Sequence, residues 1–154
     1  MRIEFQATVL DESGAPAHAA TYMRERRMVL EEALMADAGE FARIFVHELF
    51  HFAWLRLGNV KRRSYERLVA GELRRGTRGE LGWSAEWRKE KLNVRDRTQR
   101  TRKWREYCCE SFCDTAAWAY AGLRKHDEFS LGKAARERRR KWFAVTGLDG
   151  GIAI

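Results

Sequence analysis

The sequence predicts a mostly helical α+β fold in one domain, residues 1–154, with a small N-terminal β-sheet and a long helix in which polar residues interrupt an apolar run. A chain of 154 residues is long enough for one hydrophobic core. Hydrophobic residues make up 45% and aromatic residues 12% of the chain, which excludes a disordered protein. Strand-like patterns are confined to the first 34 residues, and helical patterns dominate the rest.

The N-terminal sheet is predicted from two segments. The stretch "RIEFQATVL" at 2–10 alternates and is rich in β-branched residues, which is typical of a strand, whereas "DESGAPAH" at 11–18 has the composition of a loop. The segment "ERRMVLEEAL" at 25–34 fits either a strand or a helix. We favour a strand because a helix start signal follows at once, with Asp37 as the N-cap and Glu40 three residues later.

The rest of the chain predicts five helices. The first should stop at Gly58 and Asn59, which suit a left-handed C-cap. The polar stretch "NVRDRTQRT" at 93–101 is predicted as a loop or exposed turn, and the tail at 147–154 as irregular. The predicted helices are 38–57, 64–74, 84–92, 102–123 and 131–145.

Targeting and redox signals favour the cytoplasm. The stretch "MRIEFQATVL" lacks the pattern of a signal peptide, and no apolar run approaches membrane-spanning length. The three cysteines, Cys108, Cys109 and Cys113, are odd in number and lie close together, so they do not form a disulfide framework. We therefore expect a cytoplasmic protein without a membrane segment.

Positive charge is concentrated in the middle of the chain. The net charge is +8, and residues 61–105 hold 16 Lys and Arg against 6 Asp and Glu. The simplest interpretation is a solvated helical surface. The same segment is also a candidate for contact with nucleic acid or an acidic partner protein.

The strongest chemical signal is "FVHELFHFAW" at 45–54, where His47, Glu48 and His51 interrupt a run of large apolar side chains. A spacing of four places the two histidines one turn apart on the same helix face, within reach of one ion. Glu48 is rotated by about 100° from His47 and can serve as a general base beside a zinc ion. The alternative, two core histidines with satisfied hydrogen bonds, requires an expensive burial of three polar groups.

A catalytic zinc needs a third protein ligand. Glu110 and Asp114 lie four residues apart on a helix rich in small and apolar residues, so Glu110 can ligate the ion while Asp114 orients a ligand histidine. An exposed pair of acidic residues is the alternative, but their apolar neighbours argue against it. Other candidates for the third ligand are His18, His126 and the cysteine cluster.

Cys109 and Cys113 offer a rival site. They also share a helix face, and with the two histidines they would close the coordination sphere and make the zinc structural. We favour Glu110 because an open site gives Glu48 a purpose. His126 and Tyr107 are candidates for stabilising an oxyanion, although a surface histidine and a buried tyrosine are equally ordinary.

The combination of "HELFH" and "ESFCD" resembles the gluzincin branch of the zincin-like metallopeptidases. The resemblance implies that His47, His51 and Glu110 bind zinc, that Glu48 is the general base, and that Asp114 orients a histidine. It covers about residues 26–58 and 104–121.

The resemblance has two further implications. The segment "RRMVLEEALM" at 26–35 resembles the edge strand that lies beside the substrate backbone in such enzymes. Glu110 lies 59 residues after His51, farther than in thermolysin-like members, so residues 60–103 are expected to be a basic helical insertion.

Two functions follow as expectations. The first is a zinc peptidase that hydrolyses a peptide or protein substrate with a metal-activated water and Glu48 as the base. The second is a non-catalytic binding module of the same fold, which docks on nucleic acid or an acidic partner through its Arg-rich segment.

Overall fold

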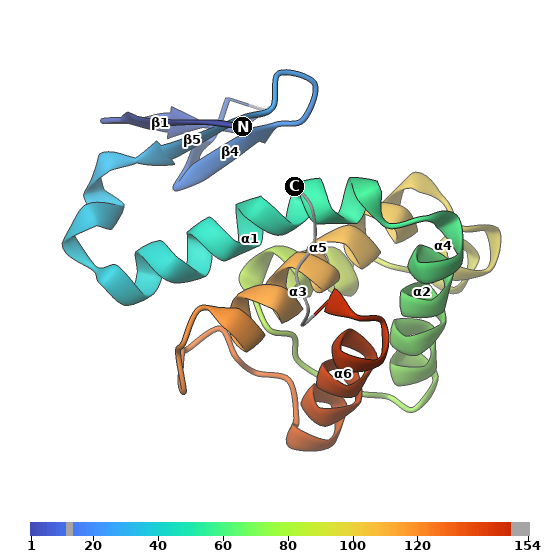
Figure 1. The fold of residues 1–154 in the computed structure, drawn as a ribbon. Coiled ribbons are helices and arrows are strands. Elements are labelled where there is room, and N and C mark those ends of the chain that lie inside the picture. Colours follow the sequence, from blue (N-terminus) through green and yellow to red (C-terminus); the bar gives the residue numbers. More distant parts are fainter. Residues whose placement is uncertain (12–13, 149–154) are drawn as a thin grey trace.

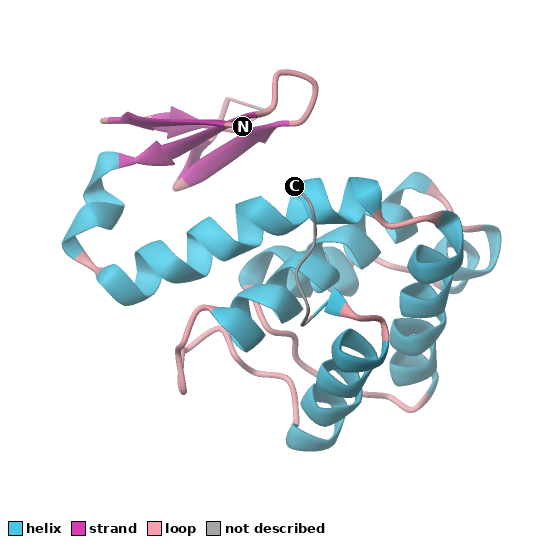
Figure 2. Cartoon of the chain, viewed as in Figure 1, coloured by secondary structure: helices cyan, strands magenta, loops and turns pink. Residues whose placement is uncertain are grey.

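The computed structural model describes residues 1–11 and 14–148. It confirms a mostly helical α+β single domain with a small sheet (Figures 1 and 2). The helices are α1 (Ala38–Arg56), α2 (Asn59–Arg74), α3 (Trp83–Glu90), α4 (Val94–Gln99), α5 (Arg102–Tyr120) and α6 (Lys133–Val145), with a short 3-10 helix, η1 (Glu32–Ala36), before α1. Within the described part of the chain, none of these helices has the length and apolar character needed to cross a membrane.

The strand formed by residues 27–31 has a different place in the sheet from the one expected. The strands are β1 (Arg2–Gln6), β2 (Val9–Leu10), β3 (Pro16–Ala17), β4 (Ala19–Tyr22) and β5 (Arg27–Glu31). In the main sheet β5 is central, parallel to β1 on one side and antiparallel to β4 on the other. The expectation that 26–35 forms the edge strand is therefore wrong, because both sides of β5 are paired and the edges are β1 and β4.

The predicted strand at 2–10 is interrupted. β1 ends at Gln6, and β2 pairs instead with β3 in a separate two-stranded ribbon. The predicted loop at 11–18 contains β3, because the turn that follows β2 brings Pro16 back beside Leu10.

Helix α1 begins as predicted. The Asp37 carboxylate accepts hydrogen bonds from the backbone N–H groups of Gly39 at 2.9 Å and Glu40 at 3.0 Å, so it is a true N-cap. The segment before it, predicted as one strand, divides into β5 and the 3-10 helix η1, and η1 carries the chain from the sheet to the helix.

The end of α1 differs from the prediction. Gly58 has a φ of −59° and serves as the N-cap of α2, so no left-handed cap forms there. The Arg62 side chain, one turn into α2, donates to the carbonyl oxygens of Trp54 and Leu55. Because these terminal carbonyls are satisfied by a guanidinium, the helix does not need a left-handed glycine.

Helix α4 occupies the stretch predicted as a loop. Asn93 and Asp96 form a reciprocal capping box, and Arg100 closes the helix with a left-handed φ of 50°. Strong caps at both ends compensate for the low helix propensity of so short a polar segment.

Helix α1 is the central element, lying between the sheet on one side and α2, α3, α5 and α6 on the other (Figure 1). On the sheet side, Phe52 packs in one cluster with Met28, Leu30 and Leu34. On the helical side, a larger cluster is built around Phe112, whose ring lies 5.1 Å from those of Trp54 and Phe143. Burial on both sides explains why the sequence of α1 is apolar almost all round.

Candidate metal centre

Three donor atoms converge between α1 and α5. His47 Nε2 lies 3.2 Å from His51 Nε2 and 3.3 Å from an oxygen of Glu110, and that oxygen lies 4.0 Å from His51 Nε2. The two histidines come from consecutive turns of α1, and Glu110 comes from the facing helix. We call His47, His51 and Glu110 the candidate metal centre; among the described residues they form one of two groups able to hold an ion.

The spacing of these donors fits zinc. Tetrahedral zinc with bonds of about 2.0–2.2 Å to nitrogen and oxygen places neighbouring ligand atoms roughly 3.4 Å apart. Two of the three observed separations, 3.2 and 3.3 Å, are close to this value, and the third, 4.0 Å, needs only a small shift of the Glu110 side chain. Three ligands also leave a fourth position open.

Asp114 lies directly behind His47. One carboxylate oxygen accepts a hydrogen bond from His47 Nδ1 at 2.7 Å, and the other accepts from the backbone N–H of Ala85 at 3.1 Å. Both His47 and Asp114 are buried. Because the proton is held on Nδ1, the Nε2 lone pair of His47 faces the candidate metal centre.

Gly82 makes room for Asp114. A Cβ atom on Gly82 would lie 2.2–2.5 Å from the Asp114 carboxylate group, which is far inside van der Waals contact. Gly82 is the N-cap of α3, so the carboxylate sits at the start of that helix and accepts its backbone N–H. Sequence reasoning missed this residue, because a glycine before a helix has no pattern that points to a distant carboxylate.

Glu48 stands beside the candidate metal centre and is not one of its ligands. Its carboxylate accepts a 2.5 Å hydrogen bond from the hydroxyl of Thr21, on the edge strand β4. Glu48 is half-buried and lines a cavity of about 540 Å³ together with His47, His51 and Glu110. The carboxylate is therefore both held in place and open to a small molecule in that cavity.

Helix α3 forms the wall opposite β4. Ser84 donates to the Glu110 oxygen that faces the histidines, at 2.7 Å, and Arg88 lies 3.6 Å from the other oxygen. Trp83 and Trp87 are 64% and 40% exposed at the cavity, with ring centroids 6.0 Å apart. The segment expected to be an insertion thus supplies part of the site, which the sequence did not indicate.

Charge in the site favours a cation. Burial lowers the pKa of His47, but the charge and hydrogen bond of Asp114 outweigh it, and the pKa is raised well above its ordinary value. Burial also lowers the pKa of His51, whereas the charges of Cys109 and Glu110 raise it to about 9. Burial raises the pKa of Glu110, but the charge of His51, the hydrogen bond and charge of His47, and the charge of Arg88 together lower it by more, so the net shift is downward. Without a metal, His47 and His51 bind protons, which supply the positive charge that a metal cation would otherwise bring.

The cysteines lie on the far edge of the His51 ring. Cys109 Sγ is 3.5 Å from His51 Nδ1, and Cys113 joins them in a second possible metal group. Within residues 1–11 and 14–148, no single group contains both histidines and both cysteines, so the predicted rival site with four ligands is not assembled.

Arg43 and His126 belong to a separate ion-pair group. Arg43 pairs with Glu40 at 2.5 Å and with Glu128 at 3.1 Å, and Glu128 also accepts the backbone N–H of Trp83 at 2.7 Å. His126 Nε2 lies 3.1 Å from Glu40. The expectation that His126 faces the open coordination position is not met, because its ring points to Glu40 at the other end of α1.

The remaining candidates also have other partners. Tyr107 is fully buried and donates to Glu80 at 2.7 Å, so it does not reach the cavity as an oxyanion stabiliser. His18 Nδ1 lies 2.8 Å from Glu31, on the sheet. Within the described part of the chain, His18 belongs to no group of His, Cys, Asp and Glu side chains that could hold a metal.

Several Arg and Lys side chains of the basic segment make contacts within the protein that stabilise the fold. Arg100 makes two 2.6 Å bonds to Glu66, and Lys89 donates to the carbonyl of Gly79 at 2.7 Å. Residues 60–103 also contribute Tyr65 to the main core. A basic surface is therefore only part of the role of this segment.

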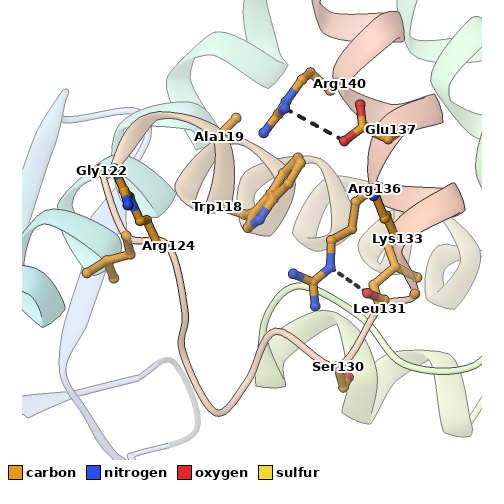
Figure 3. Close-up of a pocket in the computed structure, with 12 residues that line it drawn as sticks. Trp118, Ala119, Gly122, Arg124, Ser130, Leu131, Lys133, Arg136, Glu137 and Arg140 are labelled. Carbon is orange, nitrogen blue, oxygen red and sulfur yellow. Dashed lines mark hydrogen bonds and ion pairs between the residues drawn. The ribbon is translucent and has the colours of Figure 1, made fainter.

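A second cavity, of about 720 Å³, lies between the end of α5 and the start of α6 (Figure 3). Two of its cations are already engaged: Arg136 donates to the carbonyl of Leu131, and Arg140 lies over the Trp118 ring and pairs with Glu137 at 3.7 Å. It shares no lining residue with the cavity at the candidate metal centre.

Comparisons of the chain with protein-family models, with curated protein sequences and with solved structures find no match.

Proposed function

We propose that the protein is a zinc-dependent peptidase of a reducing compartment such as the cytoplasm. The observation that carries this proposal is the convergence of His47, His51 and Glu110 at tetrahedral spacing, with Glu48 beside them and outside the ligand set. The three cysteines are free, which is consistent with a reducing compartment.

The charge of the site supports a divalent cation. With neutral histidines, Glu48, Glu110 and Asp114 bring three negative charges, and Arg88 brings one positive charge at 3.6 Å from Glu110. Arg43 does not change this balance, because it is paired with two other carboxylates. The excess of two negative charges is the amount that one Zn²⁺ neutralises.

Each residue has a chemical role in this proposal. His47, His51 and Glu110 would hold the zinc ion, which when bound would supply polarisation of a scissile carbonyl and a water molecule with a pKa of about 7. Glu48 accepts a proton from the attacking water and passes it to the leaving amine. The Thr21 hydroxyl fixes the orientation of Glu48 throughout.

The surroundings of the site suit an extended peptide. β4 is one of the two outer strands of the three-stranded sheet, and its residues 19–22 line the same cavity as Glu48. An extended chain can add to such an edge through its backbone hydrogen bonds. The opposite wall, with Trp83 and Trp87, offers apolar surface to a substrate side chain.

The substitution Glu48→Gln tests the proposal. It keeps the size of the side chain and its bond to Thr21, but removes the base, so peptide hydrolysis should fall by roughly 10²–10⁴-fold. Zinc content should stay the same, because Glu48 is not a ligand. Hydrolysis is followed on a peptide mixture by mass spectrometry, with Glu90→Gln on the exposed face of α3 as the matched control. Retained hydrolysis, or loss of zinc equal to that of His47→Ala, would overturn the proposal.

The alternative function, a binding module for nucleic acid or an acidic partner, stays a prediction. If it holds, Glu48→Gln has no effect on function, and binding to duplex DNA weakens with salt at a slope near −0.9 for each neutralised phosphate. A flat salt response would leave the basic segment as solvated surface.

A further inference from the structure

Two facing helices carry the same five-residue pattern. Residues 47–51 read "HELFH" on α1, and residues 109–113 read "CESFC" on α5. Each stretch places two metal-ligating side chains one helical turn apart, with a glutamate after the first and a phenylalanine before the second. The phenylalanines, Phe50 and Phe112, lie with ring centroids 5.8 Å apart, so the two stretches lie side by side.

The His51 ring lies between His47 of the first stretch and Cys109 of the second. Its Nε2 atom lies 3.2 Å from His47 Nε2, and its Nδ1 atom lies 3.5 Å from Cys109 Sγ. One donor atom from each of His51, Cys109 and Cys113 lies within 4.8 Å of the other two. In tetrahedral zinc, bonds of about 2.05 Å to nitrogen and 2.3 Å to sulfur place those two atoms roughly 3.6 Å apart. The separation of Cys109 and His51 matches that edge.

The two cysteines of this second possible metal group, Cys109 and Cys113, differ in their surroundings from the neighbouring Cys108. Cys108 belongs to neither possible metal group in the described residues, although it precedes Cys109 in the chain. A helical step of about 100° separates adjacent side chains, so Cys108 and Cys109 point in different directions. Cys109 is only half-buried, which leaves a small ion a path to it, whereas Cys113 is buried behind it.

We propose that His51 Nδ1 and the sulfur atoms of Cys109 and Cys113 form a second metal site, selective for a thiophilic cation such as Cd²⁺ or Cu⁺. Soft thiolate ligands favour such ions, whereas the nitrogen and oxygen donors of the candidate metal centre offer no sulfur to them. Binding releases two protons from the group of His51, Cys109 and Cys113 to solvent, and the cation forms two bonds to sulfur and one to nitrogen.

Occupancy of the second site also regulates the first. A neutral imidazole has one free nitrogen, so when Nδ1 ligates the thiophilic ion, the proton of His51 resides on Nε2. The candidate metal centre then loses one of its three ligands. This competition rests on the proposed zinc site, but the binding of a thiophilic ion to the thiols does not.

Titration of the metal-free protein with Cd²⁺, under a phosphine reductant, tests the proposal. Thiolate-to-cadmium charge transfer should appear in the near ultraviolet and saturate at about one Cd²⁺ per chain. Glu110→Ala should keep the band, because it removes a ligand of the zinc site only. Cys109→Ala and Cys113→Ala should each lose most of it, and His51→Ala should weaken the affinity roughly tenfold or more while the band persists.

Cys108→Ala is the matched control and should keep both the band and the affinity. The proposal is overturned if the wild type shows no band, if the band survives in the Cys109→Ala/Cys113→Ala variant, or if Cys108→Ala removes it. Circular dichroism of each variant checks folding, and the two single variants decide the matter if the double variant does not fold. A normal band together with absent peptidase activity would contradict the proposed function alone.

Discussion

Two clusters of buried charge pack against α5, and they are built on different principles. In the first, Arg139 donates to Glu80 at 2.7 Å and to Glu72 at 2.8 Å, while Tyr107 donates to Glu80 at 2.7 Å. We call these residues, with Lys89 at 3.2 Å from Glu80, the Arg139 cluster. Its two cations balance its two carboxylates, and Arg139 is 0% exposed.

The candidate metal centre has the opposite character. The three carboxylates in and beside it, Glu48, Glu110 and Asp114, outnumber the one nearby cation, Arg88. It also borders a cavity, whereas the members of the Arg139 cluster line neither of the two cavities described above. A balanced and closed cluster holds helices together, and in this one the internal partners satisfy every buried side-chain polar atom except Glu72 Oε1. A cluster with excess negative charge beside a cavity is satisfied only by something from outside. Burial of charge by itself therefore does not identify a functional site.

The largest expected effect lies in the Arg139 cluster. Arg139→Met leaves Glu72 and Glu80 buried without their main partner, so the free energy of unfolding should fall by about 3–5 kcal/mol in urea denaturation. Zinc content of the folded fraction should not change. Arg140→Met, an exposed neighbour on α6, should change stability by less than about 0.5 kcal/mol. Equal effects of the two substitutions would show that the cluster is not structural.

The second effect is a pH dependence confined to the metal centre. The folded-state pKa of His47 lies well above its ordinary value of 6.5, so its contribution to stability is complete below pH 6.5 and is lost as pH rises towards the folded pKa. The metal-free protein should therefore lose up to about 1.4 kcal/mol for each pH unit above 6.5. His51 adds little, because Cys109, whose pKa is lowered to about 6 by its bond to Cys113, gives up the proton that His51 gains.

Thermal unfolding of the metal-free protein from pH 6.5 to 9 measures this dependence. His47→Gln should flatten it, whereas Arg139→Met should leave its slope intact. Zinc affinity should rise over the same interval, because the metal displaces protons from the histidines. A melting temperature that rises with pH in the metal-free wild type would contradict the charge assigned to the centre.

The third prediction compares the glycine N-cap of α3, Gly82, with that of α6, Gly132. Gly82→Ala forces Asp114 away from His47, so zinc affinity should drop by roughly 10–100-fold, as for Asp114→Asn. Gly132→Ala is the matched control, since a Cβ atom there meets nothing within 4 Å. Competition with a chromophoric chelator measures both variants, and equal affinities would remove Asp114 from the account.

The smallest effect concerns Thr21. Thr21→Val keeps the shape of β4 but removes the donor to Glu48, so kcat should fall by less than about tenfold with zinc content unchanged. Steady-state kinetics at saturating peptide decide this point. A loss as large as that of Glu48→Gln would mean that Thr21 acts on the reaction directly.

The sequence predicted the parts of the site that depend on local periodicity. The spacing of His47 and His51 and that of Glu110 and Asp114 are properties of single helices, and the Asp37 cap is a contact between near neighbours. These features were expected, and the structure brings the four side chains together.

The parts that the sequence did not predict are contacts between distant segments. Thr21, Gly82 and Arg88 reach the site through the placement of β4 and α3, and no local pattern distinguishes them from ordinary strand, turn and surface residues. The expectation that His126 faces the open coordination position was not met for the same reason, since one histidine in a loop has no periodicity that fixes the direction of its side chain. The charge balance that separates the two buried clusters is likewise a property of the packed structure alone.

Metal content is the most direct test of the central claim, that two histidines and Glu110 hold zinc in an open site. Elemental analysis of protein purified without chelator should find about one zinc per chain in the wild type and in the Cys109→Ala/Cys113→Ala variant. Glu110→Ala, left with two ligands, should retain little. If the double cysteine variant loses zinc while Glu110→Ala keeps it, the zinc is held by the thiols and the proposed active site is contradicted.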